Sequence, residues 1–142
     1  MYALRSDDTC RFLTLDFDEE TWKFDVQSLR KLCSENDIPV AIEISRSGNG
    51  AHLWFFFEDL ITATLARNFG TAILQSAMCE NHAISFSSFD RMFPNQNTMP
   101  KGGYGNLIAL PLQGQAVKLG HSVFVDENFL PYQDQWSFFI IM

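Results

Sequence analysis

We predict an α+β fold for this chain from three observations in its 142 residues. Apolar runs with the composition of β-strands alternate along the chain with two stretches of helical periodicity, Asp25–Glu35 and Leu60–Met78. A turn at Gly48-Asn49-Gly50 joins two of the apolar runs into a hairpin. The resulting order, β-α-β-β-α-β, is the split βαβ arrangement of ferredoxin-like and RRM-like domains, and we expect the helices to pack mainly on one face of the sheet.

The first predicted strand, Arg11–Asp18, is rich in Phe and Leu and ends in two carboxylates, Asp16 and Asp18. Side chains i and i+2 of a strand point to the same face, so these two carboxylates project together. They repel each other, and a hard divalent cation such as Mg²⁺ or Mn²⁺ is the simplest compensation. The alternative is that the strand merely ends in the polar turn Asp18-Glu19-Glu20.

The first predicted helix, Asp25–Glu35, carries its apolar side chains on one face. Two strands follow it, Pro39–Ser47 and Ala51–Glu58. The second of these has large apolar residues on both faces. We therefore expect it to be a central strand that is covered on both sides.

The hairpin between these strands contains a second candidate site. Gly48 and Gly50 allow backbone N–H groups to approach an anion, while Ser47 can donate a hydroxyl hydrogen bond and His52 a ring N–H bond. Together these donors suit a phosphate group. The alternative is that the glycines serve only the turn and that His52 is a core histidine with ordinary partners.

A third candidate is Asp90, which lies far along the sequence from Asp16 and Asp18. Two-metal sites for phosphoryl transfer need carboxylates from separate strands, and Asp90 can supply one. Glu43 and Asp126 are rivals of the same chemical type, and a helix or turn cap is the alternative role for Asp90. The remaining elements predicted after the long helix are a strand at Ile84–Phe93, a loop at Asn95–Gly105, short strands at Asn106–Leu112 and Ser122–Val125, and a helix at Asp134–Ile141.

Composition narrows the class of protein. A hydrophobic content of 46% supports one domain over residues 1–142, and the apolar C-terminal end suggests a fragment of a longer protein. We expect no membrane partner and a cytoplasmic location, because the chain has no signal peptide and no apolar run long enough to span a bilayer. The three cysteines are widely spaced, which argues against a disulfide framework or a zinc ribbon, and Cys79-x-x-His82 is only half a metal site.

The net charge of −7 argues against a broad electrostatic interaction with a phosphate backbone. If a nucleic acid binds, metal ions or other parts of the protein must supply positive charge. Arg91 and Lys101 are possible local sources, although an ordinary solvated role is the preferred interpretation for both. Phe93 and Tyr104 could stack on a base, but core packing is the preferred role for Phe93.

Three motifs stand in a fixed order: Leu15-Asp16-Phe17-Asp18, then Ser47-Gly48-Asn49-Gly50-Ala51-His52, then Phe89-Asp90. In these motifs the chain resembles the archaeo-eukaryotic primase superfamily, which has an Asp-x-Asp after an apolar strand, a Ser-containing segment that ends in His, and an apolar residue followed by Asp. Within that superfamily it is most similar to the primase-like domain of TOTE conflict systems. Longer segments support this, namely Ser45–Trp54, Phe89–Gln96 and Gly105–Gln113, and the similarity spans about Leu4 to Phe138.

The resemblance implies a DNA primase or polymerase-like nucleotidyltransferase that acts in DNA replication. Nucleoside triphosphates would be added to the 3′-hydroxyl of single-stranded or primed nucleic acid, and the same polypeptide would carry a helicase or nuclease domain. Asp16, Asp18 and Asp90 would be catalytic and hold two Mg²⁺ or Mn²⁺ ions. The nucleotide would be bound by Ser47, Gly48, Gly50 and His52. Family members usually have a further α/β unit before the first motif, so we expect residues 1–142 alone to be a poor polymerase that tends to self-associate.

Two other functions remain open. One is a degenerate module that binds nucleotide or nucleic acid without catalysis. The other is a rolling-circle type nuclease, which uses a similar sheet but needs two histidines on one strand and a nucleophilic tyrosine on a helix. Ala51–Glu58 contains only one histidine, and no tyrosine lies on a convincing predicted helix, so the nuclease is the weaker alternative.

Overall fold

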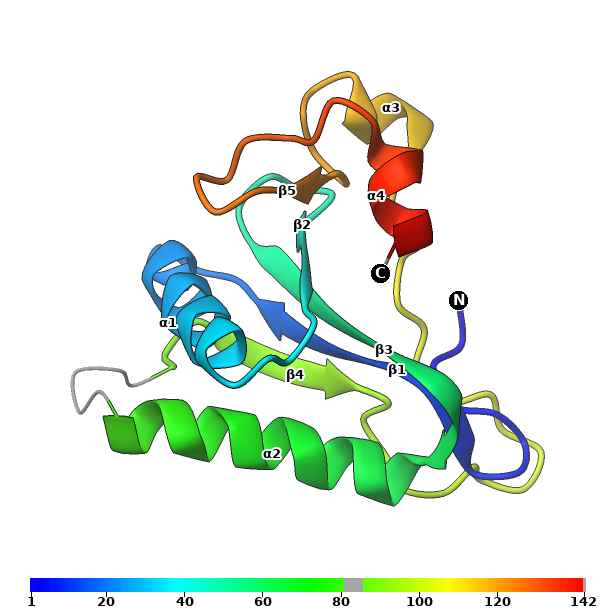
Figure 1. The fold of residues 1–142 in the computed structure, drawn as a ribbon. Helices are drawn as coiled ribbons and strands as arrows, with labels where there is room; N and C mark the ends of the chain where they lie inside the picture. The colour runs from blue at the N-terminus through cyan, green and yellow to red at the C-terminus, as the bar shows by residue number, and fades with distance from the viewer. Residues whose placement is uncertain (81–85, 142) are drawn as a thin grey trace.

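The computed structural model describes residues 1–80 and 86–141, which form a five-stranded antiparallel sheet and four helices (Figure 1). In chain order the elements are β1 (Thr9–Phe17), α1 (Trp22–Glu35), β2 (Ala41–Ile44), β3 (Ala51–Thr62), α2 (Ala63–Glu80), β4 (Phe89–Phe93), α3 (Gly114–Val117), β5 (Phe124–Val125) and α4 (Gln135–Ile141). The sheet order β4-β1-β3-β2-β5 and the βαββαβ order of its first six elements confirm the predicted α+β, split βαβ class.

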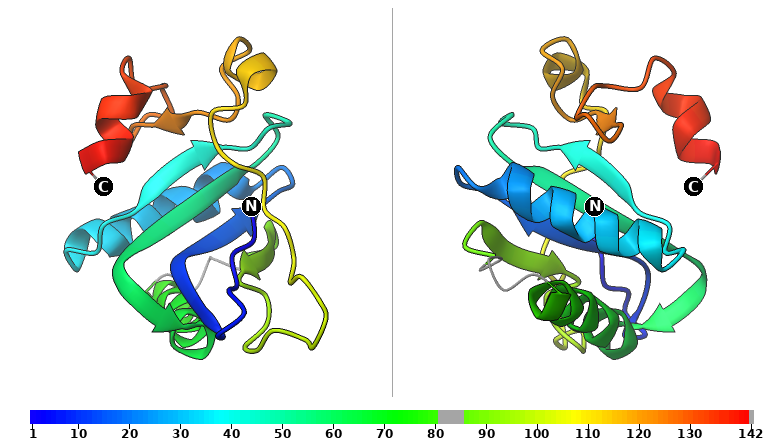
Figure 2. Two further views of the ribbon diagram at one scale, coloured as in Figure 1. Left: turned by 90° about the vertical axis from the view of Figure 1, so that its right-hand side faces the viewer. Right: turned by 60° about the vertical axis from the view of Figure 1, so that its left-hand side comes forward.

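One face of the sheet is covered by α1 and α2, which lie side by side in the right-hand view of Figure 2. Leu13, Leu15 and Phe17 of β1 are fully buried against these helices. Gly70 of α2 lies so close to β1 that a Cβ there would be 2.8 Å from a methyl group of Leu13. The predicted amphipathic helices therefore form the main core, as their apolar periodicity requires.

The opposite face of the sheet has a second buried cluster that includes Phe12, Trp54, Phe93 and Phe124. Phe138 of α4 packs against it, so α4 lies across the sheet from α2. The prediction that β3 is central and covered on both faces is confirmed, because Trp54 is buried on one side and Phe55 on the other. Core packing of Phe93 is confirmed as well.

The two-residue strand β5 is held by a side chain from α4. The amide of Gln135 accepts a hydrogen bond from the Phe124 N–H at 2.7 Å and donates to the Phe124 carbonyl at 2.9 Å. The same amide also donates to the carbonyl of Tyr132 at 2.9 Å. This side chain, together with a backbone bridge between Val125 and Pro131, therefore covers the outer edge of the sheet.

Some predicted boundaries were wrong. β3 continues to Thr62, where a helix was expected from Leu60, because Thr62 and Ile61 pair with the start of β1 and the sheet ladder overrides local helical preference. The expected strand at Asn106–Leu112 does not form, since Leu107 makes only an isolated bridge to Tyr2 and no long neighbouring strand is available there. Residues 84 and 85 of the predicted fourth strand, and His82, lie outside the described residues.

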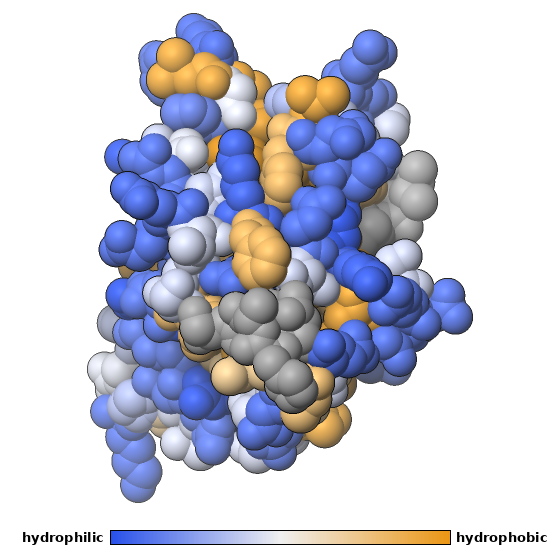
Figure 3. All heavy atoms as spheres, turned by 90° about the vertical axis from the view of Figure 1, so that its left-hand side faces the viewer, coloured by the Kyte–Doolittle hydropathy of each residue, from blue (hydrophilic) through white to orange (hydrophobic). Residues whose placement is uncertain are grey.

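The surface of the described residues is mixed. Polar residues cover most of the face drawn in Figure 3, where apolar residues gather only in small groups. Tyr104, Leu119 and Trp136 are large apolar side chains that are well exposed. Within residues 1–80 and 86–141, no helix combines the length and the apolar character needed to cross a membrane.

Candidate metal and nucleotide site

A row of paired residues crosses the sheet through all five strands. Residues directly opposite each other in neighbouring strands are, in order, Arg91, Asp16, His52, Glu43 and Phe124. Neighbouring strands lie about 4.8 Å apart, so side chains on one face of such a row contact each other. The imidazole of His52 therefore lies between two carboxylates.

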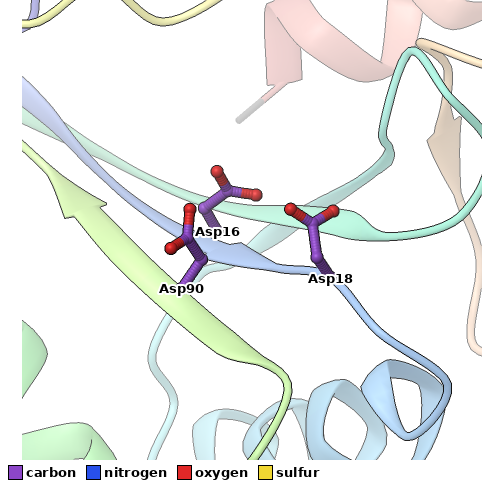
Figure 4. Close-up of side chains that lie close together, drawn as sticks. All are labelled: Asp16, Asp18 and Asp90. Carbon is purple, nitrogen blue, oxygen red and sulfur yellow. The ribbon is translucent and has the colours of Figure 1, made fainter.

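Asp18 follows the last residue of β1 and lies beside the segment that leads into β4. Its backbone N–H donates to the carbonyl of Ser88 at 2.8 Å. Its side chain is exposed, whereas that of Asp16 is half-buried. The two aspartates project to the same side of the sheet, as the i, i+2 spacing predicts (Figure 4).

A β-bulge brings Asp90 to the same place. Phe17 pairs with Phe89 and Asp16 pairs with Arg91, which leaves Asp90 as an extra residue in β4. In a regular strand the side chains of Asp90 and Met92 would point to the same face of the sheet, and Met92 packs against the core beneath the helices. Bulges commonly redirect a side chain next to functional sites, and this one turns the Asp90 carboxylate toward β1.

The three carboxylates form a compact acidic group. One oxygen from each of Asp16, Asp18 and Asp90 lies within 4.8 Å of the others, and this is the only group of three or more potential ligands of its kind among the described residues. Burial raises the pKa of the Asp18 carboxyl, and repulsion from Asp16 and Asp90 raises it further, while His52 opposes the shift. A divalent cation would relieve this repulsion, and all-oxygen ligands suit Mg²⁺ or Mn²⁺.

The two rival carboxylates lie outside this acidic group. Asp126 accepts hydrogen bonds from the backbone N–H groups of Asn128 and Leu130 and so closes a turn. Glu43 is buried on the far side of His52 from Asp16, and its hydrogen-bond partners are His52, Trp54 and Ser122. Sequence spacing could not distinguish these roles, although a charged residue inside the apolar strand β2 was a signal that Glu43 has specific partners.

The glycine-rich hairpin forms a wall beside the acidic group. Gly48 has a φ of +81°, and a Cβ on Gly50 would lie 2.2 Å from the Phe17 carbonyl oxygen and 2.5 Å from an Asp18 carboxylate oxygen. Ser47 Oγ lies 3.0 Å from Ser45 Oγ and accepts from the Asn49 N–H at 3.2 Å. A cleft of about 590 Å³ lies between this hairpin and the start of α1, lined by Asp18, Glu19, Glu20, Trp22, Lys23, Gly48 and Asn49.

His52 points to the same side of the sheet as Asp16. Its Nδ1 lies 3.0 Å from a Glu43 carboxylate oxygen, and its Nε2 lies 3.4 Å from an oxygen of Asp16. Burial alone would lower the pKa of His52, but the hydrogen bonds and charges of Asp16 and Glu43 outweigh it and raise the pKa to about 9. His52 is therefore a cationic donor at neutral pH.

Since the folded protein holds this proton more tightly than the unfolded chain, the free energy of unfolding of the metal-free protein should fall as the pH rises from 6.5 to about 9. The stabilisation is complete below pH 6.5, and we expect roughly 1–3 kcal/mol to be lost across this range. Urea denaturation in EDTA at several pH values measures the effect. His52→Gln should show a clearly smaller fall, and an equal fall in both proteins would contradict the assignment.

Two basic side chains differ in their relation to the site. The Arg91 guanidinium Nε donates to an Asp90 carboxylate oxygen at 2.6 Å, so Arg91 adds positive charge directly to the acidic group. Lys101 belongs to a loop in which the Met99 N–H donates a hydrogen bond to the Asp8 carboxylate. Asp8 comes just before the first residue of β1, whereas Asp16 is close to the last. Eight residues of strand correspond to about 26 Å, and Lys101 is not brought to the site.

His121 is a residue of this region that the sequence analysis missed. A Cβ on Gly48 would lie 2.4 Å from two atoms of the His121 ring, so the ring packs directly on the hairpin. It comes from the segment that precedes β5, about seventy residues away in the sequence. No local pattern connects the two segments, and only the pairing of β2 with β5 brings them together.

A buried hydrogen bond holds the segment before Asp90. Ser88 Oγ donates to Asp25 Oδ2 of α1 at 2.6 Å, and both residues are buried. We predict that Ser88→Ala lowers the free energy of unfolding by about 1.5–3 kcal/mol, because it leaves a buried carboxylate without this donor. Ser87→Ala, at the exposed neighbouring position, should change it by less than about 0.5 kcal/mol in the same urea titration. Equal effects would show that the Asp25 bond contributes little.

The family model of the TOTE conflict system archaeo-eukaryotic primase domain matches residues 1–140. No curated protein matches the chain.

Proposed function

The chain belongs to the archaeo-eukaryotic primase domain family of TOTE conflict systems, within the primase-type nucleotidyltransferases, and from this premise we propose that it adds nucleoside triphosphates to a nucleic-acid 3′-hydroxyl in a metal-dependent reaction. The main support for this proposal is that the carboxylates of Asp16, Asp18 and Asp90 lie close together beside a glycine-rich hairpin. The partners are nucleoside triphosphates and single-stranded or primed nucleic acid, and the product would serve DNA replication.

In this proposal the acidic group would hold two Mg²⁺ or Mn²⁺ ions, and its carboxylate oxygens from β4 and from the end of β1 are of the type these ions prefer. When bound, such ions lower the pKa of the attacking hydroxyl and stabilise the charge that develops on the phosphate. In the reaction the 3′-hydroxyl releases its proton to solvent and its oxygen forms a bond to the α-phosphorus. The bond from that phosphorus to the oxygen that bridges it to the β-phosphate breaks, and pyrophosphate leaves.

The residues around the acidic group would bind and orient the triphosphate. The N–H groups of Gly48 and Asn49 are bonded within the hairpin, to the Ser45 carbonyl and to Ser47 Oγ. The Ser47 hydroxyl can donate to a phosphate oxygen, and Gly50 allows the hairpin backbone to lie against Asp18. The Nε2–H of His52 lies beside Asp16, where it can donate to a phosphate oxygen bound at the acidic group. Positioning of this kind accounts for much of the rate of phosphoryl and nucleotidyl transfer.

We predict metal-dependent nucleotide binding together with weak template binding for this chain. Repulsion by a net charge of −7 opposes contact with a polyanion, and physiological salt softens it without reversing it. Calorimetry with a nucleoside triphosphate in Mn²⁺ or EDTA measures the first property, and fluorescence anisotropy with a labelled single-stranded oligonucleotide measures the second. Primer extension on the same oligonucleotide tests the activity.

These measurements separate the proposal from a degenerate binding module. That alternative is favoured by the bond between Arg91 and Asp90, which compensates one carboxylate of the group without a metal. Nucleotide binding that is equally strong in EDTA, with no primer extension at any metal concentration, would support the binding module. Mn²⁺-dependent binding with measurable extension would support nucleotidyl transfer.

A further inference from the structure

Glu43 is a buried carboxylate that the proposed reaction does not use directly. It lies on β2, its side chain is 2% exposed, and it does not belong to the acidic group of Asp16, Asp18 and Asp90. Removing a carboxylate from water costs several kcal/mol unless donors compensate it. The partners of Glu43 therefore indicate why a charged residue occupies this position.

Three donors from two parts of the chain meet at this carboxylate. Its Oε2 lies 3.0 Å from Nδ1 of His52 and accepts from the indole Nε1 of Trp54 at 2.9 Å. Its Oε1 accepts from the Ser122 hydroxyl at 3.1 Å. Trp54 and Ser122 are neutral donors, one on each oxygen, so His52 is the only one of the three that can carry a positive charge opposite Glu43.

This contact determines which ring nitrogen of His52 faces the acidic group. Glu43 and His52 are directly opposite each other in the β2–β3 ladder, and His52 and Asp16 are opposite each other in the β1–β3 ladder. With Nδ1 directed at Glu43, only Nε2 is directed toward Asp16. A ring flip would break the Glu43 contact, and a carboxylate behind a histidine commonly determines its orientation and tautomer.

We propose that Glu43 is a positioning residue, which holds the His52 ring so that Nε2–H is directed at the phosphate oxygens of a nucleoside triphosphate bound beside Asp16. This inference rests on the proposed function of the site. Glu43 itself touches neither the nucleotide nor the metal. Its effect passes through His52, and the effect therefore disappears when His52 is absent.

The test is a double-mutant cycle on triphosphate affinity in Mn²⁺, measured by calorimetry. Glu43→Gln should weaken binding about tenfold, because the charged acceptor that fixes the ring is lost. In a His52→Ala background the same change should have no further effect, since the residue it acts through is gone. Equal losses in both backgrounds would indicate a merely structural role and overturn the proposal.

The matched control is Trp54→Phe, which removes the other donor to the same Glu43 oxygen and leaves the His52 contact in place. It should leave triphosphate affinity within about twofold, whatever it does to stability. If Glu43→Gln does not fold, Glu43→Asp keeps the charge but withdraws the carboxylate from His52, and it should weaken binding in the same way. Loss of affinity in Trp54→Phe equal to that in the Glu43 variants would overturn the proposal.

Nuclear magnetic resonance of the histidine ring tests the orientation without nucleotide. Wild-type protein and Trp54→Phe should show a slowly exchanging proton on Nδ1 of His52, and Glu43→Asp should lose it. Wild-type protein that binds no triphosphate in Mn²⁺ would overturn both the proposed function and this inference. Wild-type protein that binds triphosphate as tightly as Glu43→Gln does would overturn this inference alone.

Discussion

Replacing Asp18 with Asn is expected to slow metal-dependent nucleotidyl transfer by at least about a hundredfold, the usual consequence of removing one preorganised electrostatic group. The change removes a charged oxygen ligand from a group whose three carboxylates lie within 4.8 Å of one another. Affinity for Mn²⁺ should fall as well. Single-turnover primer extension and a Mn²⁺ titration measure the two effects.

The stability of the Asp18→Asn protein provides an internal check. Because the folded structure raises the pKa of Asp18, its ionised form opposes folding, and the neutral amide should make the metal-free protein slightly more stable. Loss of activity together with unchanged or increased stability separates a functional defect from misfolding. Glu35→Gln removes the same charge from an exposed position on α1 and should leave activity unchanged. Full activity in Asp18→Asn would show that this carboxylate holds no catalytic metal.

The second large effect is expected at Gly50. A methyl group at this position would lie 2.2 Å from the Phe17 carbonyl oxygen and 2.5 Å from the Asp18 carboxylate. Phe17 is paired with Ala51 of β3 on one side and with Phe89 of β4 on the other, so its carbonyl cannot move aside freely. Gly50→Ala should therefore lower the free energy of unfolding by about 3 kcal/mol. The same clash displaces Asp18, and a misplacement of about 1 Å can reduce activity on the order of a hundredfold. Urea denaturation and primer extension measure these effects.

Gly114→Ala is the matched control for that change. No atom lies within 4 Å of a Cβ built on Gly114, which begins the short helix α3. Alanine favours helix over glycine by roughly 0.5–1 kcal/mol, so this variant should be neutral or slightly stabilised. If Gly50→Ala behaves like Gly114→Ala, the hairpin does not press against Asp18 in solution.

The sequence predicted the parts of the site that depend on neighbours along the chain. Asp16 and Asp18 were expected to project together from their spacing alone, and the glycines were expected to form a hairpin that ends near His52. The association of Asp90 with this pair came from the motif resemblance, because a gap of more than seventy residues contains no local signal. The structure brings Asp90 to the pair through a bulge between β1 and β4, which no pattern in the sequence indicated.

Contacts between strands explain the predictions that failed. Glu43 was weighed as a metal ligand because carboxylates of one type are indistinguishable in a sequence, whereas the ladder register places it opposite His52. Thr62 lies in a strand because the start of β1 pairs with it, and Asn106–Leu112 lacks such a partner. The contact of His121 with the hairpin likewise depends on β5 joining the sheet at β2.

The sequence by itself determined the α+β class, the common direction of Asp16 and Asp18 at the end of the first strand, and the chemical types of the candidate ligands. These properties follow from residue spacing within single elements, where each side chain's direction is set by the backbone period. Only the tertiary structure decided that Asp90 faces the pair on β1 and that Glu43 lies behind His52. Such contacts depend on which strands pair and in what register, and register is a property of long-range packing rather than of any one segment.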